Sequence, residues 1–282
     1  MKARRRHALR SRAAALAAGT ILAPLPARAA PWIPLAGTGE IKPMVRYFRA
    51  DTAFPAKGGF TTNAVPGPSA SETQFRVTGD HGLGGGFALE YDLRYGWAEK
   101  NRAKGKRLIF GAAHGPRDQE IGLAYGLTQT PAFADSVVFH VEFPTGSAGT
   151  TPALGTGRWA VEPDFEIGTR FAHNRLELTG KFGARAFLDG LTTQLRATVQ
   201  AGFKPTSRIK LWTEAFYVRS IVQRDRIPPA ADGELYNVLR LGGGIGFRLT
   251  PRLAPYLLYE RYVAGKAIHA GQRLTIGLAI QY

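Results

Sequence analysis

The feature that most constrains the fold is a strict alternation of apolar residues with polar or small ones. It is clearest in the last ten residues, where the even positions from Leu274 to Tyr282 are large and apolar and the odd positions are polar or small. Because successive side chains of a β-strand point to opposite sides, such a segment has one apolar and one polar face. The same alternation recurs over 87–97, 158–171, 175–182, 195–204 and 239–250.

The length of these runs distinguishes a membrane barrel from a soluble β-sandwich. Strands are typically about 5–6 residues long in soluble proteins, whereas strands tilted across a bilayer need about 9–11. Most of the alternating runs reach or exceed the longer range. The sequence therefore predicts an all-β protein, a transmembrane antiparallel up-and-down β-barrel, with a soluble sandwich as the alternative.

Turn signals between the runs predict about twelve strands. We place them at 41–50, 72–80, 85–97, 118–127, 135–143, 158–171, 174–187, 193–204, 208–221, 234–250, 252–264 and 271–282. Short connections alternate with longer ones at 51–71, 98–117, 144–157 and 222–233, and both chain ends fall on the short side, as in outer-membrane barrels. The segment 106–113 is assigned to a loop, with a strand over 107–110 as the alternative.

The first 29 residues have the pattern of an export signal. They contain seven basic and no acidic residues, an apolar run over 13–25, and a small-x-small site that ends at Ala29. These features define a cleaved signal peptide, and the apolar run is too short to span a bilayer. We expect export by the general secretory route. The expected mature barrel covers 30–282, with an N-terminal periplasmic extension at 30–40.

Composition excludes several kinds of site. The chain has no cysteine, which removes disulfides, thiolate metal sites, cysteine nucleophiles and a lipoprotein anchor. The net charge of +16 comes partly from the signal; beyond residue 29, 30 Lys and Arg face 21 Asp and Glu. Because this excess is spread along the chain and not gathered in one run, it indicates no nucleic-acid partner.

The C-terminus indicates how the protein is assembled. Tyr282, Ile280 and Leu278 lie on the apolar face of the last run. An aromatic end of this kind resembles the C-terminal signal that the barrel assembly machinery of bacterial outer membranes reads. Aromatic rings are also expected at lipid headgroups, and those near predicted strand ends are Tyr95, Trp97, Phe143, Trp159, Phe171, Phe203, Phe247 and Tyr282. The expected partners are therefore the assembly machinery and the lipids of a Gram-negative outer membrane.

Three segments resemble a known family. Residues 118–127 begin with Asp-x-Glu-x-Gly-Leu, residues 137–146 end with Phe-Pro-Thr-Gly, and residues 154–157 read Leu-Gly-Thr-Gly. This succession is similar to the family of outer-membrane proteins named for the MetA pathway of phenol degradation, over roughly residues 75–282. The resemblance implies an exported barrel with a role in transport, and aromatic or organic acids as solutes by analogy. It supplies no catalytic residues.

Residues suited to catalysis are scarce. His140 is predicted inside a strand and facing the lumen, where a barrel lipase would pair it with a serine on a neighbouring strand. The adjacent strands offer Thr169 and Thr128 but no well-placed serine, and no pair of histidines stands out at metal-ligand spacing. We therefore expect no enzyme activity, catalytic residue, metal or cofactor. The alternative is a closed barrel acting as a lipase-like enzyme or as a structural or adhesive surface protein.

Charged residues on the predicted inner face indicate the pore lining. Strands three to six carry the acidic residues Glu90, Asp92, Glu120, Glu142, Glu162, Asp164 and Glu166. Strands seven to twelve carry the basic residues Lys181, Arg185, Arg196, Lys204, Lys210, Arg240, Arg248 and Arg273. Because buried unpaired charges are costly, they must face water or one another. We expect an outer-membrane channel or transporter for small solutes, with a water-filled pore polarised across its width. The alternative is a lumen filled by cross-barrel ion pairs and a plug.

Overall fold

The computed structural model describes residues 31–104, 107–188, 192–222 and 236–282. The strands are β1 (Gly39–Phe54), β2 (Val65–Gly84), β3 (Phe87–Lys104), β4 (Arg107–Pro116), β5 (Gln119–Gln129), β6 (Phe133–Phe143), β7 (Ala160–Phe171), β8 (Leu176–Phe187), β9 (Thr192–Phe203), β10 (Ile209–Val222), β11 (Asn237–Phe247), β12 (Leu253–Lys266) and β13 (Ile268–Gln281). Within these ranges no helix is long and apolar enough to cross a bilayer. The expected signal peptide, 1–29, and most of the expected loop 222–233 lie outside the described residues.

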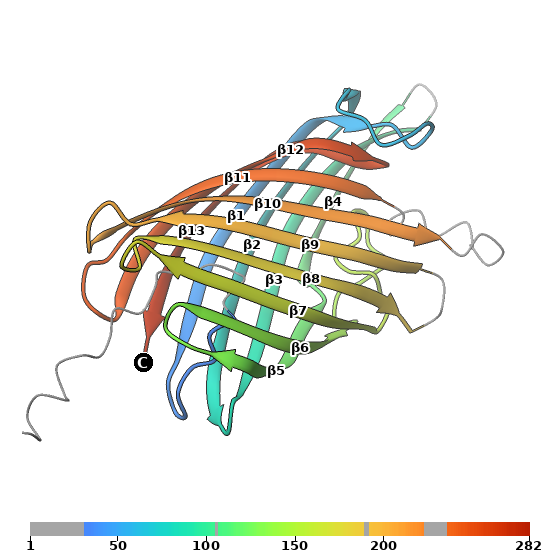
Figure 1. Ribbon diagram of the computed structural model, residues 1–282. Helices are drawn as coiled ribbons and strands as arrows, with labels where there is room; N and C mark the ends of the chain where they lie inside the picture. The colour runs from blue at the N-terminus through green and yellow to red at the C-terminus, as the bar shows by residue number, and fades with distance from the viewer. Residues whose placement is uncertain (1–30, 105–106, 189–191, 223–235) are drawn as a thin grey trace, which may run out of the picture.

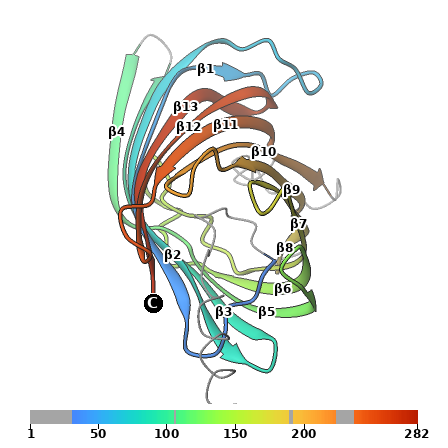
Figure 2. The same ribbon diagram turned by 60° about the vertical axis from the view of Figure 1, so that its left-hand side comes forward.

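Hydrogen bonds close the strands into one antiparallel barrel (Figures 1 and 2). From β5 onward each strand pairs with the next, and β1 pairs with both β2 and β13, which joins the two ends of the sheet. β4 and β5 share one position, because β4 pairs with residues 95–104 of β3 and β5 with residues 87–92. The barrel therefore has twelve strand positions, which confirms the predicted fold and strand number.

The segment 106–113 was assigned wrongly to a loop. Its residues from Arg107 onward belong to β4, which continues the sheet beside an extended β3. The loss of apolar alternation after Trp97 marks the end of the lipid-facing part and not the end of the strand, because backbone pairing does not require an apolar face. The connection between β1 and β2 shortens likewise, from the expected 51–71 to 55–64.

The two ends of the barrel differ. The turn end holds Pro31, the C-terminus and the short connections between β2 and β3, β5 and β6, β7 and β8, β9 and β10, and β11 and β12. The loop end holds the longer connection 144–159. At the loop end Ala267 alone joins β12 to β13, with a φ of 56°. The predicted strands left only the short stretch 265–270 for this connection. The alternation of short and long connections along the chain favours a long one at this place.

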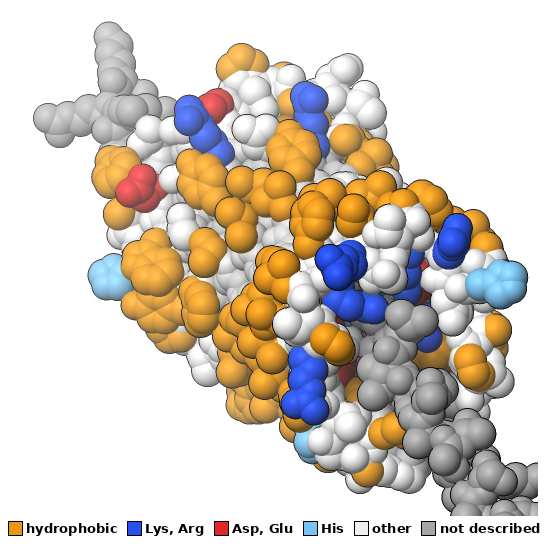
Figure 3. All heavy atoms as spheres, turned by 90° about the vertical axis from the view of Figure 1, so that its left-hand side faces the viewer, with side chains coloured by type: hydrophobic (Ala, Val, Ile, Leu, Met, Phe, Trp, Pro, Cys, Tyr) orange, Lys and Arg blue, Asp and Glu red, His pale blue; other side chains and the backbone are white. Residues whose placement is uncertain are grey.

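The alternation places apolar side chains outside and polar ones inside. In β13, for example, Ile276 is 59% exposed and the neighbouring Thr275 only 1%. Figure 3 shows hydrophobic side chains spread over the outer surface, with Lys and Arg side chains gathered at the turn end. Such an outer surface is compatible with lipid, which cannot hydrogen-bond exposed polar groups.

Aromatic rings form two bands on this outer surface. Towards the loop end, the rings of Tyr95 and Trp97 lie 4.8 Å apart and those of Phe143 and Trp159 lie 4.9 Å apart. At the turn end the predicted aromatic residues are exposed just before or after the ends of their strands; they are Phe171, Phe203, Phe247 and Tyr282. Two aromatic bands, one near each end of the strands, are typical of a barrel that spans a bilayer.

Residues 31–33 lie inside the turn end of the barrel (Figure 2), within the segment 30–40 for which we expected a periplasmic extension, whereas Leu35 is 78% exposed. Pro31 is fully buried. Trp32 lies under the guanidinium of Arg170, 3.5 Å from the ring centroid, and Ile33 packs against inward-facing side chains of β3, β5 and β6. The apolar start of the described chain therefore fills part of the lumen.

Candidate functional site

The lumen is the candidate site, because charged side chains point into it from both halves of the barrel. All the predicted pore-lining residues within strands take inward-facing positions, and Lys204 and Arg248 directly follow β9 and β11 on the same side. Many are almost fully buried, with Glu166 at 1% and Lys210 at 0% exposure. Charges this deeply buried need partners, since an unpaired one would cost several kcal/mol.

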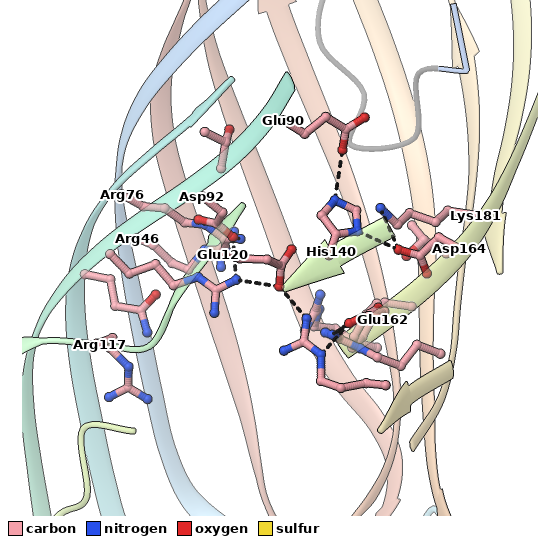
Figure 4. Close-up of a pocket in the computed structure, with 18 of the residues that line it drawn as sticks. Arg46, Arg76, Glu90, Asp92, Arg117, Glu120, His140, Glu162, Asp164 and Lys181 are labelled. Atoms are coloured by element: carbon pink, nitrogen blue, oxygen red, sulfur yellow. Dashed lines mark hydrogen bonds and ion pairs between the residues drawn. The ribbon is translucent and has the colours of Figure 1, made fainter. Parts of the chain in front are cut away.

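Arg185 joins three acidic residues, two of which, Glu120 and Glu162, are labelled in Figure 4. It lies on β8, and its Nη2, Nη1 and Nε atoms bond to Glu120 of β5, Glu142 of β6 and Glu162 of β7. Arg196 of β9 adds a second cation to Glu162 at 2.7 Å. One guanidinium thus bridges three carboxylates that would otherwise repel one another, and Arg196 adds a second positive charge to the group.

A second group of ion pairs links β2, β3 and the same carboxylates. Asp92 is bonded by Arg76 and, at 2.5 Å, by Nη2 of Arg94. Arg94 also lies 3.5 Å from Glu120 and 3.7 Å from Glu142. The two groups therefore form one network along the inner wall from β2 to β9.

His140 lies between two carboxylates of this wall. Its Nδ1 is 2.9 Å from Asp164 and its Nε2 is 3.0 Å from Glu90. Lys181 lies 3.1 Å from both Asp164 and Glu166. Both ring nitrogens of His140 are thus occupied by carboxylates, and among the described residues no hydroxyl group bonds to either of them. The arrangement is suited to holding charge.

Near the turn end a smaller cluster surrounds Glu177. Lys210 donates to this carboxylate at 2.9 Å and Arg170 at 3.2 Å, while Lys204 lies 4.0 Å away. Lys204 directly follows β9, and burial lowers its pKa to about 8, against the opposing effect of Glu177. Together with the packed residues 31–33, this cluster narrows the turn end of the lumen.

A cavity of about 380 Å³ lies between the two walls of the lumen. Ten Lys and Arg residues and six Asp and Glu residues line it, all within the described part of the chain. The predicted separation into an acidic and a basic wall does not hold locally, because Arg185, Arg94 and Lys181 bond directly to the acidic residues. Such ion pairs stabilise charged side chains in a confined space that holds little water.

A closed antiparallel barrel with an apolar exterior, aromatic bands and a charged interior is a bacterial outer-membrane β-barrel. The sequence agrees with this class: the family model described as "Putative MetA-pathway of phenol degradation" matches residues 110–267, more than half of the chain. The chain belongs to this family, as the three motifs indicated.

Solved structures show the same fold at low sequence identity. An outer membrane channel from Pseudomonas putida F1 is 12% identical, with a TM-score of 0.67 over 92% of this chain and 100% of that one. The NanC porin is 11% identical, with a TM-score of 0.52 over 86% and 100%. The translocator domain of the autotransporter NalP from Neisseria meningitidis is 10% identical, with a TM-score of 0.51 over 88% and 89%. No curated protein is significantly similar in sequence. Because barrels with different roles share this fold, the fold alone does not decide the function.

Several lumen residues escaped the sequence analysis. Arg46 and Arg76 of the first two strands face inward, as does Glu260 of β12, which bonds Arg240. All three stand at even positions of alternating runs. Arg46 and Arg76 were left out because the predicted walls began at the third strand, and Glu260 because only basic residues were assigned to strands seven to twelve. Phe216 of β10, which also lines the cavity, lies 4.2 Å from the guanidinium of Arg240.

Proposed function

We propose that the protein is an outer-membrane channel for small water-soluble solutes. The observation that carries this proposal is the charged cavity inside a closed, lipid-compatible barrel. Its volume of about 380 Å³ falls within the range of small-molecule sites, about 300–1,000 Å³. The titles of two similar structures name a channel and a porin, which supports the proposal through fold alone.

The side chains inside the lumen favour a narrow, selective passage over a wide pore. Ion pairs from β2 to β9 leave few free charges on one wall, and Trp32 with the Glu177 cluster narrows the turn end. Solutes would enter the cavity from the loop end and pass the turn end when residues 31–33 move. The turn end would face the periplasm, as in other outer-membrane barrels.

The test is single-channel recording of the purified, refolded full-length mature protein in planar bilayers. Stepwise conductance in KCl supports a channel, and a barrel that inserts without conducting contradicts it. Insertion is checked separately by the heat-dependent shift in electrophoretic mobility that folded barrels show. We propose no catalytic role for His140, since its ring nitrogens bond Asp164 and Glu90.

A further inference from the structure

The inner wall from β9 to β13 carries an unbroken alternation of arginine and aromatic side chains. One residue from each strand takes part: Arg196, Phe216, Arg240, Tyr262 and Arg273. We call this set the arginine–aromatic ladder. All five residues line the same cavity as the ion-paired wall opposite.

Each arginine of the ladder lies against an aromatic ring. The guanidinium of Arg240 is 4.2 Å from the ring centroid of Phe216 and 5.7 Å from that of Tyr262. Arg196 lies 5.6 Å from Phe216, and Arg273 lies 5.6 Å from Tyr262 while donating to its hydroxyl at 2.6 Å. Contacts within about 6 Å are cation–π interactions, which hold the guanidinium groups in place.

Ion pairs join the three arginines of the ladder to Glu260 and Glu162. Arg240 and Arg273 share Glu260, and Arg196 shares Glu162 with Arg185. On the opposite wall Arg185 meets three carboxylates and Lys181 meets two. The excess of basic over acidic residues around the cavity therefore lies on the ladder side, where a bound anion would be stabilised.

We propose that the ladder binds a carboxylate attached to an aromatic ring. Guanidinium groups recognise carboxylates through paired hydrogen bonds. Arginine planes and aromatic faces that alternate beside them offer stacking surfaces to a planar ring. This inference rests on the channel function proposed above and specifies its solute. It requires both parts of the ligand, so that acetate, which lacks the ring, and benzyl alcohol, which lacks the charge, should bind poorly.

Two arginines can be removed without leaving a carboxylate unpaired. In Arg196→Gln, Glu162 keeps Arg185, and in Arg273→Gln, Glu260 keeps Arg240. Phe216→Leu keeps an apolar side chain and removes the aromatic face. The control is Arg219→Gln, which removes one positive charge from an exposed position of β10 whose cross-strand neighbour on β9, Leu195, faces outward.

The experiment is equilibrium dialysis of benzoate, acetate and benzyl alcohol against the purified full-length mature protein in detergent, with KCl conductance recorded on the same preparations. We expect benzoate to bind at least about tenfold more tightly than either of the other two. The double variant Arg196→Gln/Arg273→Gln should lose about tenfold or more of the benzoate affinity, and Arg219→Gln should lose none. Phe216→Leu should weaken benzoate but not acetate.

Two results would overturn the proposal: equal binding of benzoate and acetate, or unchanged benzoate binding in the double variant with its barrel still heat-modifiable. Failure of the channel function would look different. In that case KCl conductance would be absent, while benzoate would still bind in the wild-type barrel and bind more weakly in the double variant. The dialysis therefore tests whether the ladder binds an aromatic carboxylate, and the recording tests whether the barrel conducts ions.

Discussion

The carboxylate of Asp118 accepts a hydrogen bond from the backbone N–H of Thr156 at 2.6 Å, across 38 residues of sequence. It also accepts one from the N–H of Gly146 at 3.0 Å, so that one side chain holds both ends of the loop between β6 and β7. A Cβ atom on Gly155 would lie 2.3 Å from the Asp118 carboxylate, which explains a glycine there. The three motifs that resemble the family thus meet at one point of the loop end.

Replacing this anchor should release the loop. Asp118→Asn removes the charge that strengthens both hydrogen bonds, which are worth about 1.5–3 kcal/mol each when one partner is charged. Leu154, only 2% exposed in the loop, should become accessible to thermolysin while the barrel stays heat-modifiable. Asp135→Asn, at a turn-end carboxylate that accepts from the N–H of Thr128, is the control. An equal cleavage rate at Leu154 in wild type and Asp118→Asn would contradict the anchor.

Removing Trp32 should open the turn end. Its ring occupies lumen space between Arg170 and Gly168, where a Cβ on the glycine would lie 2.7 Å from the indole. We expect Trp32→Ala to raise the single-channel conductance severalfold. Trp97→Ala, which removes an outward-facing indole, should leave it unchanged. If both variants conduct as wild type does, residues 31–33 do not set the narrowest part of the path.

Arg185→Gln should destabilise the barrel strongly. Three buried carboxylates lose a shared cation, and removing one member of a buried pair costs about 3–5 kcal/mol. Urea unfolding in lipid vesicles, followed by tryptophan fluorescence, should show this loss. Arg185→Lys keeps the charge but cannot bond all three carboxylates with the same geometry. Its free energy of unfolding should therefore lie between those of the wild type and Arg185→Gln. An undiminished free energy of unfolding in Arg185→Gln would mean that water, and not Arg185, stabilises these carboxylates.

The last residue should matter for assembly through its ring. The hydroxyl of Tyr282 lies 2.9 Å from Nδ1 of His81, and the two rings stack with centroids 5.8 Å apart. We expect Tyr282→Asp to lower the amount of heat-modifiable barrel in the outer membrane, because it places a charge on the apolar face of β13. Tyr282→Phe keeps the ring and should assemble normally. Equal amounts of folded barrel for all three proteins would show that assembly does not read this position.

The orientation of the barrel can be tested with epitope tags. A tag after Ala148, in the loop between β6 and β7, should be labelled on intact cells, because the loop end should face outward. A tag between Thr206 and Ser207, in the turn between β9 and β10, should be labelled only after the outer membrane is permeabilised. Labelling of the second tag on intact cells would reverse the orientation.

Much of the fold was predictable because alternation is local. In a strand the side chain of residue 275 must face away from that of 276, whatever the rest of the chain does. The inward direction of residues such as Glu142 and Lys210 follows from this alone, while the length of the runs indicated the barrel class and the turns between them the twelve positions. The strand at 107–110 was missed because its face beyond the membrane carries no alternation.

The contacts inside the barrel depended on the tertiary structure. Which inward residues become neighbours is set by register and closure, which place Arg185 of β8 against Glu120 three positions around the wall and bring Tyr262 of β12 beside Arg240. The position of Trp32 inside the lumen has no local signal either, since its ring lies against Arg170 and Gly168, which are more than a hundred residues further along the chain. The sequence alone determined which face each side chain takes, because that is a property of one strand. Only the closed barrel decided which charges pair and which rings meet, because those distances arise from all the strands together.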